Sequence, residues 1–139
     1  MIYAVIDTNV LVSALITHNS EAATAKVVSL LVEGDFIPLY DGKIIEEYQE
    51  VLYRTKFNLL PGVAESLISF ILEHGIESSR TAFMESMPDE DDRVFYEVAL
   101  SHEESFFVTG NLKLILCKDM FYFISLQVLL TKITTPIII

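Results

Sequence analysis

Two polar residues follow closely on apolar runs of this chain. Asp7 comes directly after the run at residues 2–6, and Asn111 comes just after the run FFVT at residues 106–109. Short apolar runs of this kind are typical of strands buried inside a sheet. If the strands are parallel, their carboxyl ends meet at one edge of the sheet, where functional residues gather. Carboxylate and amide oxygens there would suit a hard divalent cation.

An adjacent pair of acids lies in the middle of a predicted helix over residues 42–53. The apolar residues of that helix recur at helical spacing at Ile44, Tyr48 and Val51. A glutamate in mid-helix usually lies in solvent, and Glu46 fits that description. Glu47 flanks the apolar stripe, so it is the better candidate for a cleft.

A run of four acids, D-E-D-D at residues 89–92, opens another predicted helix over 89–103. Acids are favoured in a first helical turn because they complement the positive end of the helix dipole, so Asp91 and Asp92 have a structural explanation. Asp7 has one too, as a helix N-cap. Because Asn9 could take that capping role, the carboxylate of Asp7 needs another explanation.

These polar residues lie in a chain that alternates between apolar runs and helical patterns. Strands are predicted at 2–6, 36–40, 106–109 and 122–124, with Pro38 favouring an edge position for the second. Apolar spacing predicts helices at 10–15, 23–31, 42–53, 61–75 and 89–103, and a short one from Ser125. Gly34 stands where a helix C-cap would lie, and the polar residues 76–88 are predicted to form a loop.

This alternation predicts an α/β/α sandwich around a central, mostly parallel, twisted sheet. Val5, Ile6, Phe107 and Val108 are expected in its buried strands. The length of 139 residues and the 52% hydrophobic content fit a single domain over 1–139 and exclude a disordered chain.

Charge and cysteine content narrow the functional classes. The net charge of −11 argues against a broad basic surface that would bind nucleic acid. The longest apolar stretch, residues 120–130, is too short to span a bilayer, and the first residues lack the basic start of a signal peptide. Cys117 is the single cysteine, which is consistent with a reducing compartment. We therefore expect a cytoplasmic protein.

Four blocks of sequence together resemble one family. They read V-I-D-T-N-V-L-V-S-A, I-I-E-E-Y-Q-E-V-L, D-E-D-D-R-V-F-Y-E-V-A-L and F-F-V-T-G-N. In this order and spacing they resemble the PIN-domain family, in particular its bacterial and archaeal branch of toxin components of toxin–antitoxin systems (VapC-like ribonucleases). The resemblance runs from Tyr3 to about Leu130. It implies a PIN-like fold and a metal-dependent endoribonuclease that uses Mg²⁺ or Mn²⁺.

The resemblance also implies roles for individual residues. The family's catalytic and metal-binding acids match Asp7, Glu47 and Asp92, and a fourth metal position, often Asp in the family, matches Asn111. This departure puts a second tightly bound metal in doubt, since a neutral amide is a weaker ligand; Asp89, Glu90 or Asp91 are candidates to compensate. The supporting residues on this reading are Thr8, Asn9, Asp91 and Thr109.

Partners follow from the same resemblance. It implies an RNA substrate, a cognate antitoxin protein and a homodimer. The apolar segments 120–130 and 136–139 are the candidates for additional buried surface in such a dimer.

Two alternatives remain open from the sequence. One is a PIN-fold module that binds RNA or protein without cutting, which the acidic charge and Asn111 favour. The other is an aspartate-based phosphatase, although Asn9 stands where such an enzyme needs a general acid. Zinc is not expected, because His18, His74 and His102 lack ligand spacing with Cys117.

Overall fold

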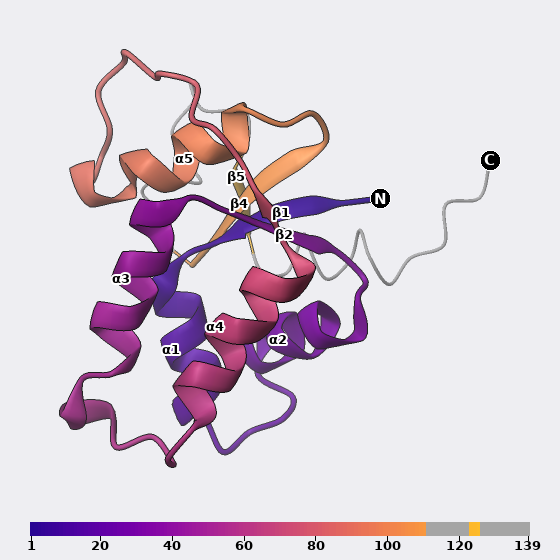
Figure 1. Cartoon of the computed structure of the whole chain (residues 1–139), viewed down its shortest axis with the longest axis vertical. Helices are drawn as coiled ribbons and strands as arrows, with labels where there is room; N and C mark the ends of the chain where they lie inside the picture. Colours follow the sequence, from indigo (N-terminus) through magenta and orange to yellow (C-terminus); the bar gives the residue numbers. More distant parts are fainter. Residues whose placement is uncertain (111–122, 126–139) are drawn as a thin grey trace.

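The computed structural model describes residues 1–110 and 123–125. The strands in this part of the chain form one sheet in the order β3-β2-β1-β4-β5, and each neighbouring pair is parallel (Figure 1). Their bounds are Tyr3–Ile6 for β1, Ile37–Tyr40 for β2, Ile76–Glu77 for β3, Ser105–Thr109 for β4 and Phe123–Ser125 for β5. The predicted α/β fold with a parallel sheet is confirmed.

Helices cover both faces of this sheet (Figure 1). They are α1 (Thr8–Ile16), α2 (Ala23–Glu33), α3 (Gly42–Leu52), α4 (Val63–His74) and α5 (Arg93–Leu100), with 3₁₀ turns η1 (Thr55–Phe57) and η2 (Glu90–Asp92). Strands β1, β2 and β3 are added one after another toward one edge of the sheet. The connection through α5 then crosses back, so that β4 pairs with β1 on its other side. Because such crossovers are right-handed, α5 lies on the face opposite to α1, α2 and α4.

The centre of the sheet is apolar on both faces, as its strand sequences predict. Val5, Ile6, Phe107 and Val108 are all buried, at 0–1% exposure. Phe95 of α5 stacks on Phe107 of β4, with ring centroids 5.5 Å apart. Since aromatic side chains bury large areas, this contact fixes α5 against β4.

Two details of the sheet differ from the prediction. Strand β2 is not an edge strand, because β3, which lies in the predicted loop, pairs with it at Leu39 and Tyr40. Proline lacks the N–H that a central strand donates. The backbone N–H of Ile37 points toward β1 and donates to the carbonyl of Ile2 (3.0 Å). The nitrogen of Pro38, the next residue, therefore points toward β3. No bond is lost there, because β3 pairs with β2 only from Leu39 onward.

The ends of the last elements also differ from the prediction. The helix predicted over 89–103 is a 3₁₀ turn followed by α5, which ends at Leu100; the reversal after it includes Glu104 at a positive φ of 57°. The predicted helix from Ser125 and the two candidate dimer segments lie outside the described residues, apart from β5. No helix in the described part of the chain is both long and apolar enough to cross a membrane.

The close approach of α4 to β2 yields a stability prediction. A Cβ on Gly75 would lie 2.6 Å from the carbonyl oxygen of Pro38 and 2.5 Å from that of Ile71, both backbone atoms. Gly75→Ala should therefore lower the free energy of unfolding by about 1–3 kcal/mol, as overpacking does. Chemical denaturation measures this. Gly42→Ala is the matched control, because a Cβ there meets nothing within 4 Å, and an equal effect of both variants would contradict the packing described.

Candidate functional site

Asp7 lies at the carboxyl end of β1, where the strand becomes α1. Its side chain caps α1 by accepting from the backbone N–H of Asn9 (3.2 Å), and its other oxygen accepts from the hydroxyl of Thr109 (2.7 Å). The β1–β4 register, which pairs Ile6 with Val108, brings Thr109 beside it. The carboxylate is therefore both a helix cap and a group fixed from the neighbouring strand, with only 6% of the residue exposed.

Glu47 of α3 reaches the same region through α1. The hydroxyl of Thr8 donates to its carboxylate, which joins α1 to α3. The next residue, Tyr48, is fully buried and donates its phenolic hydrogen to the carbonyl of Ile6 (2.5 Å), directly before Asp7. Glu47 and Tyr48 of α3 are thus bonded to Thr8 and Ile6, the residues on either side of Asp7. Glu46, by contrast, is exposed.

Asp92 comes from the other face of the sheet, at the point where η2 passes into α5. It is 9% exposed and caps α5 without a side-chain hydrogen bond to that helix. The adjacent Arg93 does not neutralise it, because its guanidinium binds Glu90 through two contacts of 2.7 and 2.8 Å. Asp91 is exposed, and its backbone N–H is held by the side chain of Asp89.

The carboxylates raise one another's pKa. Burial is the largest cause for Asp7 and raises its pKa, although the hydrogen bonds from Thr109 and Asn9 oppose it. Burial also raises the pKa of Glu47, with repulsion from Asp7 adding to it against the bond from Thr8. For Asp92, burial and then the charges of Asp7, Asp89 and Glu47 raise the pKa to about 7. The region therefore holds negative charge at a high free-energy cost.

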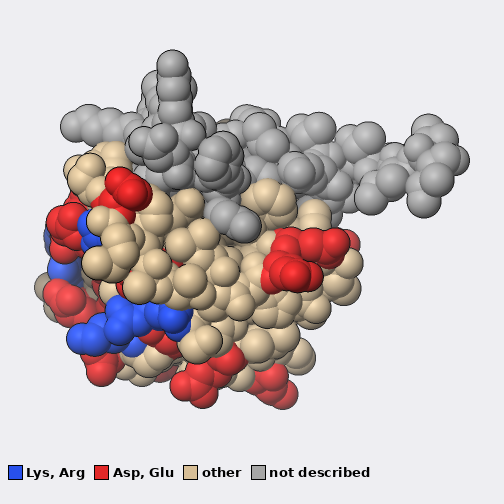
Figure 2. Space-filling model, turned by 90° about the horizontal axis from the view of Figure 1, so that it is seen from above, with Lys and Arg blue, Asp and Glu red and all other residues tan. Residues whose placement is uncertain are grey.

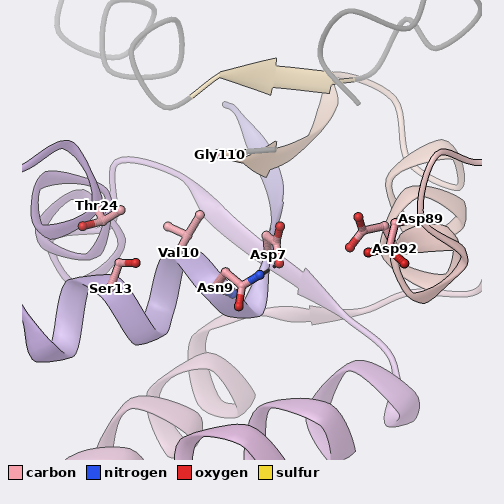
Figure 3. A pocket seen from close by; sticks show the side chains of 8 residues that line it. All are labelled: Asp7, Asn9, Val10, Ser13, Thr24, Asp89, Asp92 and Gly110. Atoms are coloured by element: carbon pink, nitrogen blue, oxygen red, sulfur yellow. Dashed lines mark hydrogen bonds between the residues drawn. The ribbon is translucent and has the colours of Figure 1, made fainter. Parts of the chain in front are cut away.

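A cavity of about 330 Å³ opens at this edge of the sheet. Its lining consists of Asp7, Asn9, Val10, Ser13, Thr24, Asp89, Asp92 and Gly110. The carboxylates of Asp89 and Asp92 face Asp7 across it (Figure 3). None of these lining residues is basic. On the face drawn in Figure 2, the basic side chains lie toward the left side of the view, next to acidic ones.

The donor atoms suit a hard cation held in part through water. Among the residues described, no group of three His, Cys, Asp or Glu side chains forms a ready-made metal site. Mg²⁺, however, binds proteins through one or two carboxylates and keeps several of its waters. Three carboxylates with raised pKa values, Asp7, Glu47 and Asp92, offer oxygen ligands and a charge that a cation would relieve. The residues present therefore fit such an ion.

The sequence anticipated part of this arrangement. The structure places Asp7 and Asp92 in the cavity lining and Glu47 in the hydrogen-bonded network beside it. Thr8 and Thr109 each bond a carboxylate, and Asn9 contributes its backbone N–H to Asp7. Asn111 lies outside the described residues, so its place as a metal ligand stays a prediction.

Two lining residues, Ser13 and Thr24, were not expected from the sequence, and a third, Asp89, was expected only as an acid that could compensate for Asn111. Asp89 lines the cavity, whereas Asp91, the supporting acid expected from the sequence, does not. The sequence of the D-E-D-D run does not show which of its four side chains enters the cavity, because the 3₁₀ turn η2 sets the direction of each side chain. Ser13 follows Asn9 by four residues on the same face of α1, a signal that could have been used. Thr24 comes from α2 and has no comparable signal.

The raised pKa of Asp92 predicts a pH-dependent stability. The ordinary value is 3.8 and the folded value is about 7, so between these the folded protein retains a proton that the unfolded chain loses. Stability from this group therefore falls as the pH rises through that window. Asp92→Asn removes the effect, and in EDTA it should raise the melting temperature at pH 8 by a few degrees, the size expected for about 1 kcal/mol, with little change at pH 4.

The exposed Asp35 provides the control for this measurement. Asp35→Asn removes the same formal charge from the surface, and its difference from wild type should be small at both pH values. An Asp92→Asn effect equal at pH 4 and pH 8 would contradict the electrostatic account of Asp92.

Comparison with known proteins identifies the family. A family model described as PIN domain matches residues 3–113, which is well over half of the chain. No curated protein gives a significant match, and neither does any solved structure. The matched range includes β1 through β4 and all of the acids just described. The parallel α/β fold, the acids at its carboxyl edge and this match together show that the chain belongs to the PIN-domain family.

Proposed function

We propose that the protein is a metal-dependent endoribonuclease that hydrolyses RNA phosphodiester bonds with Mg²⁺ or Mn²⁺. PIN domains are a nuclease-fold family and are typically metal-dependent. The observation that carries the proposal is a set of carboxylates at one edge of the sheet, the buried Asp7 and Asp92 and the half-buried Glu47, whose pKa values are raised by burial and by neighbouring negative charges. Such a set destabilises the fold unless a cation neutralises it, and strongly perturbed acids of this kind cluster at functional sites.

Each of the three acids has a part in holding the cation. Asp7 is fixed by Thr109 and by the backbone N–H of Asn9, so its carboxylate has one orientation. Glu47 is fixed by Thr8. Asp92 accepts no helix-capping bond, which leaves its oxygens free to serve as ligands. A divalent ion bound by these groups supplies charge neutralisation for the scissile phosphate and lowers the pKa of a bound water.

The chain's own charge makes the cation necessary for substrate binding. With a net charge of −11 and an acidic cavity wall, the protein repels a phosphate backbone. A cation between the carboxylates and the phosphate converts this repulsion into attraction. RNA should therefore bind productively only when the metal is present.

We extend the proposal to a cellular role. The D-T-N-V-L-V-S-A and V-T-G-N blocks support a cytoplasmic toxin component that is inhibited by a cognate antitoxin protein and forms a homodimer. Light scattering at micromolar concentration should give twice the 15.7 kDa chain mass, and a monomer mass would contradict the dimer without affecting the nuclease.

Asp7→Asn tests the nuclease directly. It removes a charged ligand while preserving the shape of the side chain. The amide oxygen can still accept from the backbone N–H of Asn9, and the amide NH2 can donate to the hydroxyl of Thr109 in place of the bond that Asp7 accepts there. Cleavage of mixed single-stranded RNA in Mn²⁺ should fall at least ~10²-fold, the scale on which a catalytic metal contributes. The melting temperature should not fall, because a repelling charge is removed.

The control variant for this assay is Asp35→Asn, which removes the same charge from an exposed position and should cleave like wild type. EDTA should abolish cleavage in both wild type and control. Wild-type protein that binds RNA without cutting it in Mg²⁺ or Mn²⁺ would overturn the proposal in favour of a PIN-fold binding module.

A further inference from the structure

The cavity has two walls of different chemistry. Its acidic wall carries Asp7, Asp89 and Asp92. Its uncharged wall, which we define as Asn9, Val10, Ser13 and Thr24, comes from α1 and the first turn of α2. Figure 3 shows that Ser13 and Thr24 lie beyond Val10, on the side away from Asp89 and Asp92. The proposed reaction uses the acidic wall, and of the uncharged wall it uses only the backbone N–H of Asn9, so the side chains of that wall are left without a role.

The uncharged wall has hydrogen-bonding capacity that the described part of the protein does not use. The hydroxyls of Ser13 and Thr24 form no hydrogen bond with another described residue, and both residues are half-buried. Asn9 and Ser13 are four residues apart in α1, so they share one face of the helix. Between them, Val10 is buried and contributes an apolar surface. An apolar floor with a few polar groups is the usual composition of a small-molecule site.

We propose that the uncharged wall binds the ribose and base of the nucleotide next to the scissile phosphate, and that Ser13 and Thr24 donate or accept hydrogen bonds to it. This inference rests on the proposed function, since the acidic wall would hold the phosphate through its cation. It assigns the two walls to the two chemically different parts of one nucleotide.

Size and charge both support this assignment. The cavity volume of about 330 Å³ is near the lower end of the ~300–1,000 Å³ range of small-molecule sites, which suits one nucleotide. Sugar and base are neutral, so the acidic wall does not repel them as it repels phosphate. Hydroxyl side chains pair with sugar and base groups in either direction, because they both donate and accept.

The assignment implies a single-stranded substrate. In an A-form helix the base edges lie in a narrow major groove or a shallow minor groove, and proteins read individual bases mainly in unpaired loops and ends. A nucleotide that enters this cavity must be unstacked from its neighbours. The chain should therefore prefer unpaired RNA over duplex RNA of the same sequence.

Removing the two hydroxyls tests the role of the wall in cleavage. The double variant Ser13→Ala/Thr24→Val preserves helix-compatible side chains and leaves Asp7, Glu47 and Asp92 unchanged. Loss of two substrate hydrogen bonds should raise KM for single-stranded RNA roughly 5- to 100-fold. The kcat should stay nearly constant, because uniform binding is lost. Ser29→Ala, at an exposed position of α2, is the control and should leave KM unchanged.

A second measurement is independent of both metal and cleavage. Uncharged ribonucleosides, titrated into the full chain in EDTA and followed by NMR, should shift the amide resonances of Asn9, Ser13 and Thr24 at millimolar concentration. The double variant should lose these shifts, while Ser29→Ala retains them. Folding of each variant is checked in the same spectra.

The outcomes separate this inference from the proposed function. Wild-type cleavage with an unchanged KM in the double variant overturns the role of the wall and leaves the nuclease intact. Nucleoside shifts at Ser13 and Thr24 without any metal-dependent cleavage support the wall and overturn the nuclease. The absence of nucleoside shifts at these residues in wild type overturns the inference, whatever the cleavage assay shows.

Discussion

Burial of like charges at the end of an apolar sheet is the constraint that governs this structure. Asp7 and Asp92 are 6% and 9% exposed, and each carboxylate loses much of its hydration there. Burial raises the pKa of both, with the charge of Asp89 adding to it for Asp7, and with the charges of Asp7 and its acidic neighbours raising that of Asp92 to about 7. This burial of charge costs free energy, so the acids are best understood as a functional requirement that the surrounding structure must support.

The support comes from hydrogen bonds that cross between elements. Thr109 of β4 fixes Asp7, Thr8 of α1 fixes Glu47, and Tyr48 of α3 binds the carbonyl just before Asp7. These bonds join β1, β4, α1 and α3 around one corner of the sheet. Arg93, the basic residue beside Asp92, binds Glu90 instead. The scaffold therefore orients the negative charges without neutralising them, as the proposed cation site requires.

Sequence reasoning succeeded where a local pattern determines position. The apolar run before Asp7 predicts a buried strand with an acid at its end, and the stripe containing Tyr48 separates Glu47 from the exposed Glu46. It failed where position depends on packing between distant segments. The two-residue β3 has no local signal, and it places Pro38 inside the sheet. Thr24 reaches the cavity only because α2 packs beside α1.

The central claim is that the buried acids bind a divalent cation together, and an anomalous diffraction measurement on crystals soaked in Mn²⁺ tests it most directly. The account predicts one strong anomalous peak between Asp7, Glu47 and Asp92, with at least two of the three carboxylates contacting the ion directly or through water. The same peak should be absent from Asp7→Asn crystals. A peak elsewhere, or none in this cavity at millimolar Mn²⁺, would contradict the account.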